Sequence, residues 1–449
     1  MSSPNLSSKQ SHREYLEKFN INQKRAMLTI ILCIMLDSFG YSLVLPLLPA
    51  IAKTFGVSYF MIGILIASNA LSALITVPIW GKLSDRYGRR PILLISQIGT
   101  GVSFLILGLS NSYYMILFAR FLDGAFGGQI PVIRAYITDI TTPQTRASHM
   151  GKIMVGYTVG MIAGPSIGGF FGYFNWRIPP FLASSLSILS IAMTLKVLVE
   201  SMPETRRIDI KEQFLLSQAN PRTKKSIFTG AVISRLSQTF LVSLISFMFT
   251  SSFPSVLFKR YGAGPSIIGS VMAVAGIGLL IYGLILMKPL IRIIGEKRIL
   301  LLTFVLNIFL FLLYPYLFEF WIVYIYILPF AFCMAFMRPL ISTNITKAVN
   351  PLRQGTVSGW AVTLQSLAQI MAPLISNGFL DINNGMGLNI GLITFNPYQL
   401  IGFTTVIFAL ILLTIGYIDL KRHPNLYSFE KIRRKREEIK KRRAKVNKT

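Results

Sequence analysis

Residues 81–91 read Gly-Lys-Leu-Ser-Asp-Arg-Tyr-Gly-Arg-Arg-Pro, and they stand between two long uncharged runs at 59–80 and 92–110. A helix that crosses the hydrocarbon core of a membrane needs about 20 apolar residues at a rise of about 1.5 Å per residue. Both runs are close to that length, and the segment between them carries four basic side chains and one acidic one. We therefore expect a short polar loop between two membrane-spanning helices.

Composition extends this prediction to the whole chain. Of the 449 residues, 53% are hydrophobic and 14% are charged, which is more apolar surface than one soluble core can hide. We expect an all-α membrane protein whose twelve transmembrane helices form two pseudo-symmetric six-helix bundles. The expected spans are 26–48, 59–80, 92–110, 114–138, 150–172, 179–198, 226–252, 266–287, 299–318, 320–345, 356–379 and 398–418.

The two halves of the chain resemble each other at a nearly constant offset. The segment 131–139 aligns with 339–347, and the same offset carries Pro165 onto Pro373. Duplication of a six-helix unit explains such an offset. The expected division is a cytoplasmic N-terminal segment 1–25, an N-terminal bundle 26–198, a cytoplasmic linker 199–225, a C-terminal bundle 226–418 and a basic cytoplasmic tail 419–449.

Charge placement predicts the orientation in the membrane. A net charge of +28 would suggest nucleic acid in a soluble protein, but here the Lys and Arg residues gather in alternate loops between the spans. Loops enriched in Lys and Arg are cytoplasmic. We expect a multi-pass protein of the cell membrane with both termini in the cytoplasm, and no cleaved signal peptide in the first 25 residues.

The tail from Lys421 to Thr449 holds 13 Lys and Arg against three Glu. A basic stretch beside a membrane attracts anionic lipid by about 1 kcal/mol per basic residue. A topology signal with no further role explains the charge equally well. Nucleic acid is not expected as a partner, because no aromatic base-stacking module accompanies the charge.

Enzyme chemistry is not expected. Cys33 and Cys333 lie inside apolar segments, which gives no disulfide framework and no metal-ligand spacing. The three histidines, His12, His149 and His423, lie in terminal or loop segments, so no nucleophile–base arrangement can be drawn. No phosphate-binding Gly-rich loop is present either. We expect no cofactor and no metal.

The segment 81–91 resembles the cytoplasmic loop signature of the major facilitator superfamily, in which a Gly, an Asp, a second Gly and several basic residues recur at these spacings. The resemblance implies that Asp85 meets the N-terminus of the span beginning near Thr356 and that Arg89 pairs with Asp139. Helix N-termini favour anions, which makes the first contact physically sensible. The implied conformational latch comprises Gly81, Asp85, Arg86, Gly88, Arg89, Arg90 and Asp139.

Two further motifs narrow the resemblance to one branch of that superfamily. The segment 120–124 is similar to the Arg-containing span-four motif of drug/proton antiporters, and 160–169 is similar to their Gly-Pro span-five motif. Residues 30–175 look most like the tetracycline/proton antiporters and their twelve-span relatives. Small residues four apart let another helix approach closely, and a proline permits bending. The antiporter-like motif is Gly160, Gly164, Pro165, Gly168 and Gly169.

Charged residues inside the spans are candidates for proton coupling. Asp37 lies about 16 Å into the first expected span, near the middle of a hydrocarbon core about 30 Å thick. A charge there costs several kcal/mol unless it is paired or hydrated. We expect Asp37 to carry the proton, Asp123 to be an alternative carrier and Arg120 to modulate either acid. A structural ion pair between Asp37 and Arg120 is an equally good explanation.

Spans one, four, seven and ten line the central cavity in the resembled superfamily. Polar residues on or near these spans are therefore candidate substrate contacts, although each one alone is more often a helix–helix contact. Arg134 and Arg338 lie close to cytoplasmic ends of spans, where a long basic side chain can extend to the headgroups. The candidate cavity residues are Tyr41, Gln129, Arg235, Gln238, Asn344, Gln365 and Gln369.

The resemblance implies a secondary active transporter that exports small amphipathic or drug-like molecules in exchange for protons by alternating access. A metabolite uptake symporter or facilitator on the same fold is the alternative, and a transporter-like receptor is a further one. The expected partners are a small-molecule substrate, protons and membrane lipid. The chain is expected to act as a monomer.

Overall fold

Short polar turns between the apolar runs supply the groups that begin the helices. The Ser58 hydroxyl accepts a hydrogen bond from the backbone N–H of Met61 at the start of α4 (Tyr59–Tyr87). A reciprocal capping box between Asn396 and Gln399 begins α17 (Pro397–Arg422). Such caps satisfy N–H groups that the first turn of a helix leaves without a carbonyl partner.

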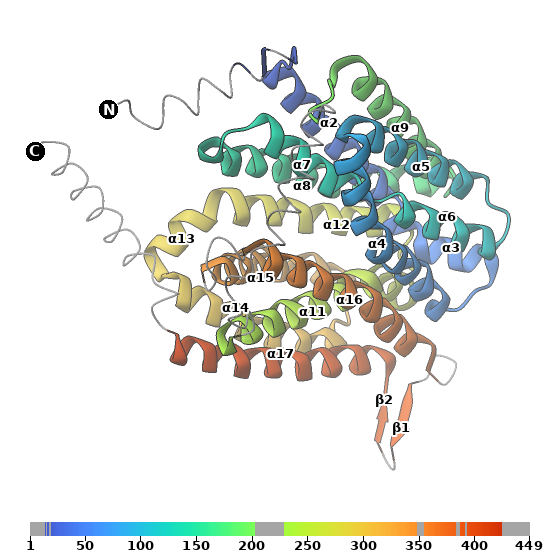
Figure 1. The fold of residues 1–449 in the computed structure, drawn as a ribbon. Coiled ribbons are helices and arrows are strands. Elements are labelled where there is room, and N and C mark those ends of the chain that lie inside the picture. The colour runs from blue at the N-terminus through green and yellow to red at the C-terminus, as the bar shows by residue number, and fades with distance from the viewer. Residues whose placement is uncertain are drawn as a thin grey trace, which may run out of the picture. The chain divides into compact units, whose positions relative to one another are not determined.

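The computed structural model describes residues 19–202, 229–347, 354–382, 387–390 and 393–423, together with Glu14, Leu16 and Glu17. These residues are helical except for connecting turns and one antiparallel hairpin of β1 (Leu388–Ile390) and β2 (Ile393–Phe395) (Figure 1). The predicted all-α membrane fold is confirmed. Most of the predicted linker and nearly all of the basic tail lie outside the described residues.

Eleven helical segments of the described residues are long and apolar enough to cross a membrane. The one predicted span that is not among them, 356–379, coincides with α16 (Gln354–Asp381), whose 28 residues reach the required length with a more polar composition. The eleven segments are Gln23–Phe55, Tyr59–Tyr87, Arg89–Leu109, Tyr113–Ile140, Ser148–Phe174, Ile178–Val197, Gly230–Tyr261, Pro265–Ile294, Glu296–Tyr316, Phe320–Ile345 and Pro397–Arg422.

The chain divides into two compact units. Unit 1 comprises Met1–Lys224 and Ser252–Ala273, and unit 2 comprises Lys225–Ser251 and Val274–Thr449. Besides α4, the first 200 residues form α2 (Gln23–Leu43), η1 (Leu45–Leu47), α3 (Leu48–Phe55), α5 (Arg89–Leu109), α6 (Tyr113–Ala125), α7 (Gln129–Ile140), α8 (Pro143–Phe174) and α9 (Ile178–Val197).

The second half of the chain is built in the same way. Two of its helices, α11 (Gly230–Tyr261) and α12 (Pro265–Leu280), contribute residues to both units. A π-helical turn, η2, follows α12 directly. The further elements of this half, apart from the hairpin, α16 and α17, are η2 (Ile281–Leu286), α13 (Met287–Ile294), α14 (Glu296–Leu313), η3 (Tyr314–Tyr316) and α15 (Phe320–Lys347).

Two glycines at equivalent positions make the same turn in the two halves. Gly88 joins α4 to α5 with a φ of 104°, and Gly295 joins α13 to α14 with a φ of 92°. A residue with a Cβ atom rarely adopts such angles, so glycine is the residue suited to this turn. The geometry agrees with the alignment of the two halves.

The fourth predicted span is broken in the structure, whereas the sequence predicted one helix over 114–138. Helix α6 ends at Ala125 and α7 begins at Gln129. Side chains of neighbouring helices take up the freed carbonyl groups: Trp80 Nε1 donates to Ala125 O at 2.6 Å, and Ser96 Oγ donates to Phe126 O. Irregular backbone inside a membrane requires such partners.

Candidate functional site

The break in the fourth span places Gln129 beside the first candidate proton carrier. Gln129 is the first residue of α7, and its Nε2 donates a hydrogen bond of 2.8 Å to Oδ1 of Asp37 on α2. Gln129 is buried, with 2% of its surface exposed, and Asp37 is partly buried. Asp37 therefore has a neutral partner in the described part of the chain, with no cation paired to it.

The second candidate carrier, Asp123, has a cationic partner. Arg120 Nη1 lies 3.5 Å from Oδ2 of Asp123, one turn away on α6. Asn69 Nδ2, on α4, donates to the same carboxylate oxygen at 3.0 Å and to the Arg120 carbonyl at 3.2 Å. Arg120 and Asp123 are both buried. Among the described residues Arg120 thus pairs with Asp123, and the ion pair considered between Asp37 and Arg120 does not form.

Asn69 is a participant that the sequence analysis missed. The sequence could have indicated Asn69, because an amide in the middle of the uncharged run 59–80 needs a polar partner in the membrane. Tyr41, another candidate cavity residue, lies on α2 one turn after Asp37 and is partly buried. Together α2, α4, α6 and α7 hold two carboxylates, one guanidinium and two amides within unit 1.

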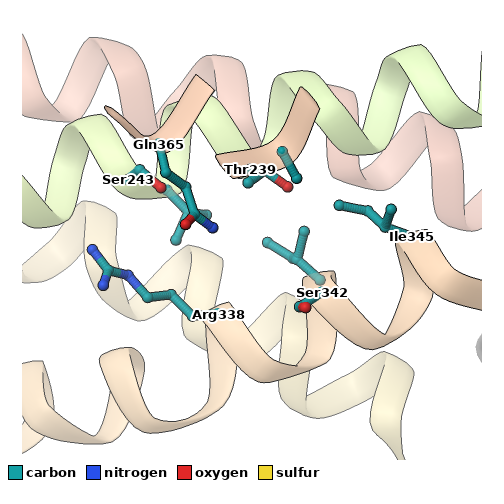
Figure 2. Close-up of a pocket in the computed structure, with 9 residues that line it drawn as sticks. Thr239, Ser243, Arg338, Ser342, Ile345 and Gln365 are labelled. Carbon is teal, nitrogen blue, oxygen red and sulfur yellow. The ribbon is translucent and has the colours of Figure 1, made fainter. Parts of the chain in front are cut away.

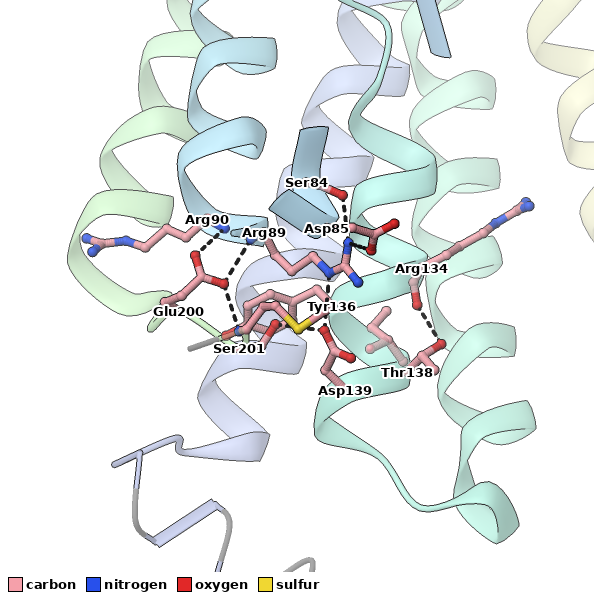
Figure 3. Close-up of polar contacts among 12 residues, drawn as sticks. Ser84, Asp85, Arg89, Arg90, Arg134, Tyr136, Thr138, Asp139, Glu200 and Ser201 are labelled. Atoms are coloured by element: carbon pink, nitrogen blue, oxygen red, sulfur yellow. Dashed lines mark hydrogen bonds and ion pairs between the residues drawn. The ribbon is translucent and has the colours of Figure 1, made fainter. Parts of the chain in front are cut away.

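The latch residues Arg89 and Asp139 form the contact that the resemblance implies. Arg89 Nε lies 3.2 Å from Oδ2 of Asp139, and 6% and 8% of their surfaces are exposed (Figure 3). Arg89 Nη1 also contacts Oδ1 of Asp85 at 2.5 Å and donates to Ser84 Oγ at 2.7 Å. Ser201 Oγ donates to Asp139 at 3.2 Å. One buried guanidinium thus ties the ends of α4, α5 and α7 together.

A carboxylate that sequence reasoning missed caps α5 next to this cluster. The backbone N–H groups of Arg89 and Arg90 donate to the two carboxylate oxygens of Glu200, at 2.8 Å and 3.0 Å (Figure 3). An anion at a helix N-terminus satisfies free N–H groups and interacts favourably with the helix dipole. The sequence could have indicated this cap, because Glu200 is an acidic residue directly after the sixth predicted span. The prediction assigned Glu200 to the linker instead.

The other latch residues lie at the surface of unit 1 or at the turn. Asp85 is largely exposed, and the guanidinium of Arg86 lies 5.3 Å from the centre of the Tyr87 ring. A Cβ added to Gly81 would meet nothing within 4 Å. The expected contact between Asp85 and the helix near Thr356 would join the two units and stays a prediction.

The glycines of the antiporter-like motif lie where α8 crosses α2. A Cβ atom on Gly160 would overlap the Met35 carbonyl oxygen, and one on Gly168 would overlap the Leu43 carbonyl oxygen. Gly164 is equally crowded by Ser42. These backbones approach each other so closely that only glycine fits, which is how small residues act between membrane helices.

The remaining two motif residues lie next to this crossing. A Cβ atom added to Gly169 would lie 3.0 Å from the Cα atom of Gly269, a residue of α12 that also belongs to unit 1. Pro165 lies inside α8, and its carbonyl oxygen would be 2.5 Å from a Cβ atom on Gly269. Both faces of this part of α8 are therefore tightly packed.

Arg235, which the sequence placed among the candidate cavity residues, lies close to the start of its helix. Helix α11 begins at Gly230, so Arg235 is about 8 Å from that end. Its Nε lies 3.3 Å from Oδ2 of Asp419 on α17, and both side chains are fully buried in unit 2. Asp419 was missed because the last span was expected to end at residue 418. Arg235 is therefore a buried ion-pair partner, not a residue on an open cavity.

The other polar residues predicted for the second half divide between buried and open positions. Gln238 is buried, and its Nε2 lies 3.3 Å from Ser234 Oγ. Asn344 is also buried. Gln365 is exposed and Gln369 is partly exposed along α16.

Unit 2 contains a partly open cavity lined by three of its helices (Figure 2). Its empty space of about 300 Å³ includes space that is open to solvent. Gln365 is the one candidate cavity residue that lines it. Arg338, which the sequence placed among residues that extend to the headgroups, stands instead at the cavity wall, with its guanidinium 5.0 Å from the centre of the Phe247 ring. The lining residues are Thr239, Val242, Ser243, Arg338, Ile341, Ser342, Ile345, Ala361 and Gln365.

Membrane-spanning helices that contain charged side chains, together with a cavity lined by both polar and apolar side chains, are features of a membrane transport protein. The model of the Major Facilitator Superfamily matches residues 30–373 and 237–443, so the chain belongs to this superfamily and the predicted resemblance is confirmed.

Relatives agree with this assignment over most of their length. "Multidrug resistance protein 2" of Bacillus subtilis (strain 168) is 27% identical over 372 residues, covering 82% of this chain and 92% of the relative. "Tetracycline resistance protein, class H" of Pasteurella multocida is 26% identical over 357 residues, covering 78% and 88%. A bacterial homolog of the human lysosomal transporter Spinster, in an inward-facing and occupied conformation, has the same fold, with a TM-score of 0.66 and 19% identity over 90% of this chain and 97% of that chain.

Proposed function

We propose that this chain exports small amphipathic, drug-like molecules across the cell membrane in exchange for protons, by alternating access of two helical bundles. The relatives named for multidrug and tetracycline resistance support this function. The observation that carries it is the pair of carboxylates in unit 1, because carboxylates inside membrane helices are costly and serve proton relays in transporters. No catalytic role is proposed for any residue.

Asp37 is the proposed proton carrier. Its partner is the neutral amide of Gln129 at 2.8 Å, whereas Asp123 has the guanidinium of Arg120 at 3.5 Å. A carboxylate without a cationic partner can lose its charge on binding a proton without leaving a buried cation unpaired. Asp123, Arg120 and Asn69 then form a fixed polar group beside the carrier, and Asp123 is the proposed alternative.

The cluster around Arg89 and Asp139 is the proposed conformational latch. It contains a buried ion pair that ties three helix ends, so a movement that separates these ends must break it. Breaking a buried ion pair costs several kcal/mol, which makes such a contact suited to stabilising one of two states. The glycine-lined crossing of α8 and α2 is the proposed place where helices bend or slide past each other during the cycle.

The orientation, assembly and lipid contacts are also proposals. The Lys and Arg residues gather in alternate loops, which supports cytoplasmic termini, and the basic tail favours contact with anionic lipid. The bundles are proposed to divide at the linker 199–225. A monomer is sufficient for the proposed cycle, because one chain supplies both bundles.

Transport in proteoliposomes tests the function. The full chain is reconstituted, and tetracycline, a quinolone and a lipophilic cation are supplied outside under an imposed proton gradient, with protein-free liposomes as the control. An antiporter accumulates drug when the lumen is acidic and releases it when the gradient is reversed. Accumulation driven by an acidic exterior would instead identify a symporter and overturn proton-coupled export.

Substitution of the carboxylates tests the carrier. We expect Asp37→Asn to abolish gradient-driven accumulation while drug still binds, and Glu319→Gln, at an exposed acid, serves as the control. If Asp37→Asn and Asp123→Asn, singly and together, all retain full coupled transport, neither carboxylate carries the proton.

A further inference from the structure

The cavity in unit 2 is built from three helices at one depth. Thr239 of α11 and Arg338 of α15 each lie about 14 Å from the helix end that is expected to be cytoplasmic, and Gln365 of α16 lies about 16 Å from its own. The three side chains thus lie at similar distances from the same expected face of the membrane. Helices of 28 to 32 residues exceed a hydrocarbon core about 30 Å thick, so these residues lie within the span, between its cytoplasmic end and its middle.

Arg338 is the single charged side chain among the nine residues that line the cavity. Its guanidinium lies over the ring of Phe247, a contact that holds the planar group in one orientation. Figure 2 shows Arg338 at the wall of the cavity. Arginine presents several N–H donors in a fixed plane, which matches the two oxygens of a carboxylate. No acidic side chain shares this lining, so the wall favours an anion over a cation.

Three neutral polar groups accompany the guanidinium. Within the described part of the chain, the side chains of Ser243, Ser342 and Gln365 form no hydrogen bond with protein groups, so they are available to a ligand. Thr239 differs, because its hydroxyl donates to the Arg235 carbonyl at 2.8 Å. Hydroxyl and amide groups that converge on a cavity fix the orientation of a ligand.

The rest of the wall is apolar. Val242, Ile341 and Ile345 are buried aliphatic residues that line the same space. An aromatic or aliphatic body placed against them loses apolar contact with water, at roughly 25 cal/mol for each Å² removed. The cavity therefore combines one cationic group, several neutral polar groups and an apolar surface.

We propose that this cavity recognises the anionic group of the transported molecule through Arg338, so that the cargo includes amphipathic carboxylates and zwitterions with an aromatic or aliphatic body. The proposal rests on the proposed function, since it names the class of molecule that the exporter carries. It gives unit 2 the task of recognising cargo, while the carboxylates of unit 1 respond to protons.

Binding to the purified full chain in detergent tests this assignment without any gradient. The probes are a quinolone carboxylate, its methyl ester and tetraphenylphosphonium, each titrated by microscale thermophoresis. The carboxylate and the ester share one ring system and differ in the anionic charge. The variants are Arg338→Gln, Arg338→Lys and Gln365→Leu, with Arg292→Gln on α13 as a control that removes one exposed arginine elsewhere.

We expect Arg338→Gln to raise the Kd of the carboxylate about 10- to 100-fold, the range of a lost charge-assisted hydrogen bond, and to leave the Kd of the ester unchanged. Arg338→Lys should retain part of the affinity for the carboxylate, because it keeps the charge and loses the planar donors. Gln365→Leu should weaken carboxylate binding several-fold, and Arg292→Gln should have no effect. If Arg338→Gln aggregates, the other two cavity variants give the test.

Three outcomes would overturn the proposal. The first is equal weakening of carboxylate and ester by Arg338→Gln, which would indicate a packing role. The second is carboxylate binding that none of the cavity variants changes. The third is tighter binding of tetraphenylphosphonium than of the carboxylate in the native chain. If any of these three outcomes is found and the chain still exports cations in vesicles, only the proposal for Arg338 is overturned. If binding depends on Arg338 but no gradient-driven transport occurs, only the proposed export function is overturned.

Discussion

Arg235 and Asp419 join α11 to α17 through an ion pair in the interior of unit 2. Nε of Arg235 lies 3.3 Å from Oδ2 of Asp419, and the exposed fractions of the two side chains are 0% and 1%. The last turn of α17 thereby meets the second turn of α11. Two helices that are distant in the sequence are thus fixed to each other by two opposite charges.

Removal of one charge from this pair should destabilise the fold. We expect Asp419→Asn to lower the free energy of unfolding by about 3–5 kcal/mol, because Arg235 then stays buried without its counter-charge. The double variant Arg235→Met with Asp419→Leu should be more stable than the single variant, because no uncompensated charge remains. Thermal unfolding in detergent, followed by tryptophan fluorescence, measures both. If Asp419→Asn unfolds at the same temperature as the native chain, the pair contributes nothing to stability.

The crossing of α8 and α2 predicts opposite effects for two substitutions on one helix. A Cβ atom on Gly168 overlaps the Leu43 carbonyl oxygen, so Gly168→Ala should push the helices apart and cost about 1–3 kcal/mol. A Cβ atom on Gly151 meets nothing within 4 Å, so Gly151→Ala should be neutral or stabilise α8 by up to about 1 kcal/mol. Thermal unfolding of the two variants side by side makes the comparison. Equal effects would contradict the close crossing.

Charge reversal tests the latch between Arg89 and Asp139. Each single reversal should abolish gradient-driven transport, because it places two like charges next to each other in a buried site. The double variant Arg89→Asp with Asp139→Arg should recover part of the activity. Recovery is expected to be incomplete because the new Asp at position 89 faces Asp85, and a third change, Asp85→Asn, should increase it. A double variant no better than the worse single one would contradict the pairing.

The cap of α5 predicts a role for Glu200 that is separate from the latch charges. Glu200→Ala removes the acceptors of the Arg89 and Arg90 backbone N–H groups and should cost about 1–2 kcal/mol of unfolding free energy. Glu200→Gln keeps one acceptor oxygen and should cost less. Thermal unfolding with Glu319→Gln as the control measures the effect. If Glu200→Gln lowers the unfolding free energy more than Glu200→Ala does, Glu200 does not act as a cap.

The helices and their boundaries followed largely from local sequence. Apolar runs of span length and the polar segments between them predicted nearly every crossing, because a membrane requires helices of that length with their backbone groups paired. The break in the fourth span was not predictable in this way. Gly127 and Gly128 follow Phe126 directly, but the span counts of apolar residues do not register such a break. Side chains from other helices, Thr76, Trp80 and Ser96, supply the partners that permit it.

The candidate site was predicted in part. The sequence singled out Asp37, Arg120 and Asp123 as charges inside spans, and the structure brings all of them into unit 1. It could not tell which of them pair, because Asn69 and Gln129 reach these charges from other helices or helix segments. The direction in which a side chain points depends on how its helix is rotated against its neighbours, and a single sequence does not give that rotation.

The sequence by itself determined that the chain is a membrane protein of paired helical bundles and which charges lie inside its spans, because helix length, apolarity and loop charge are local properties. The tertiary structure decided how those charges are partnered. It turned Arg235 from an expected cavity residue into half of a buried ion pair, and it moved Arg338 from an expected headgroup contact to a cavity wall. The physical reason is that the cost of a charge in a low-dielectric interior depends on its neighbours in space, and packing alone selects those neighbours.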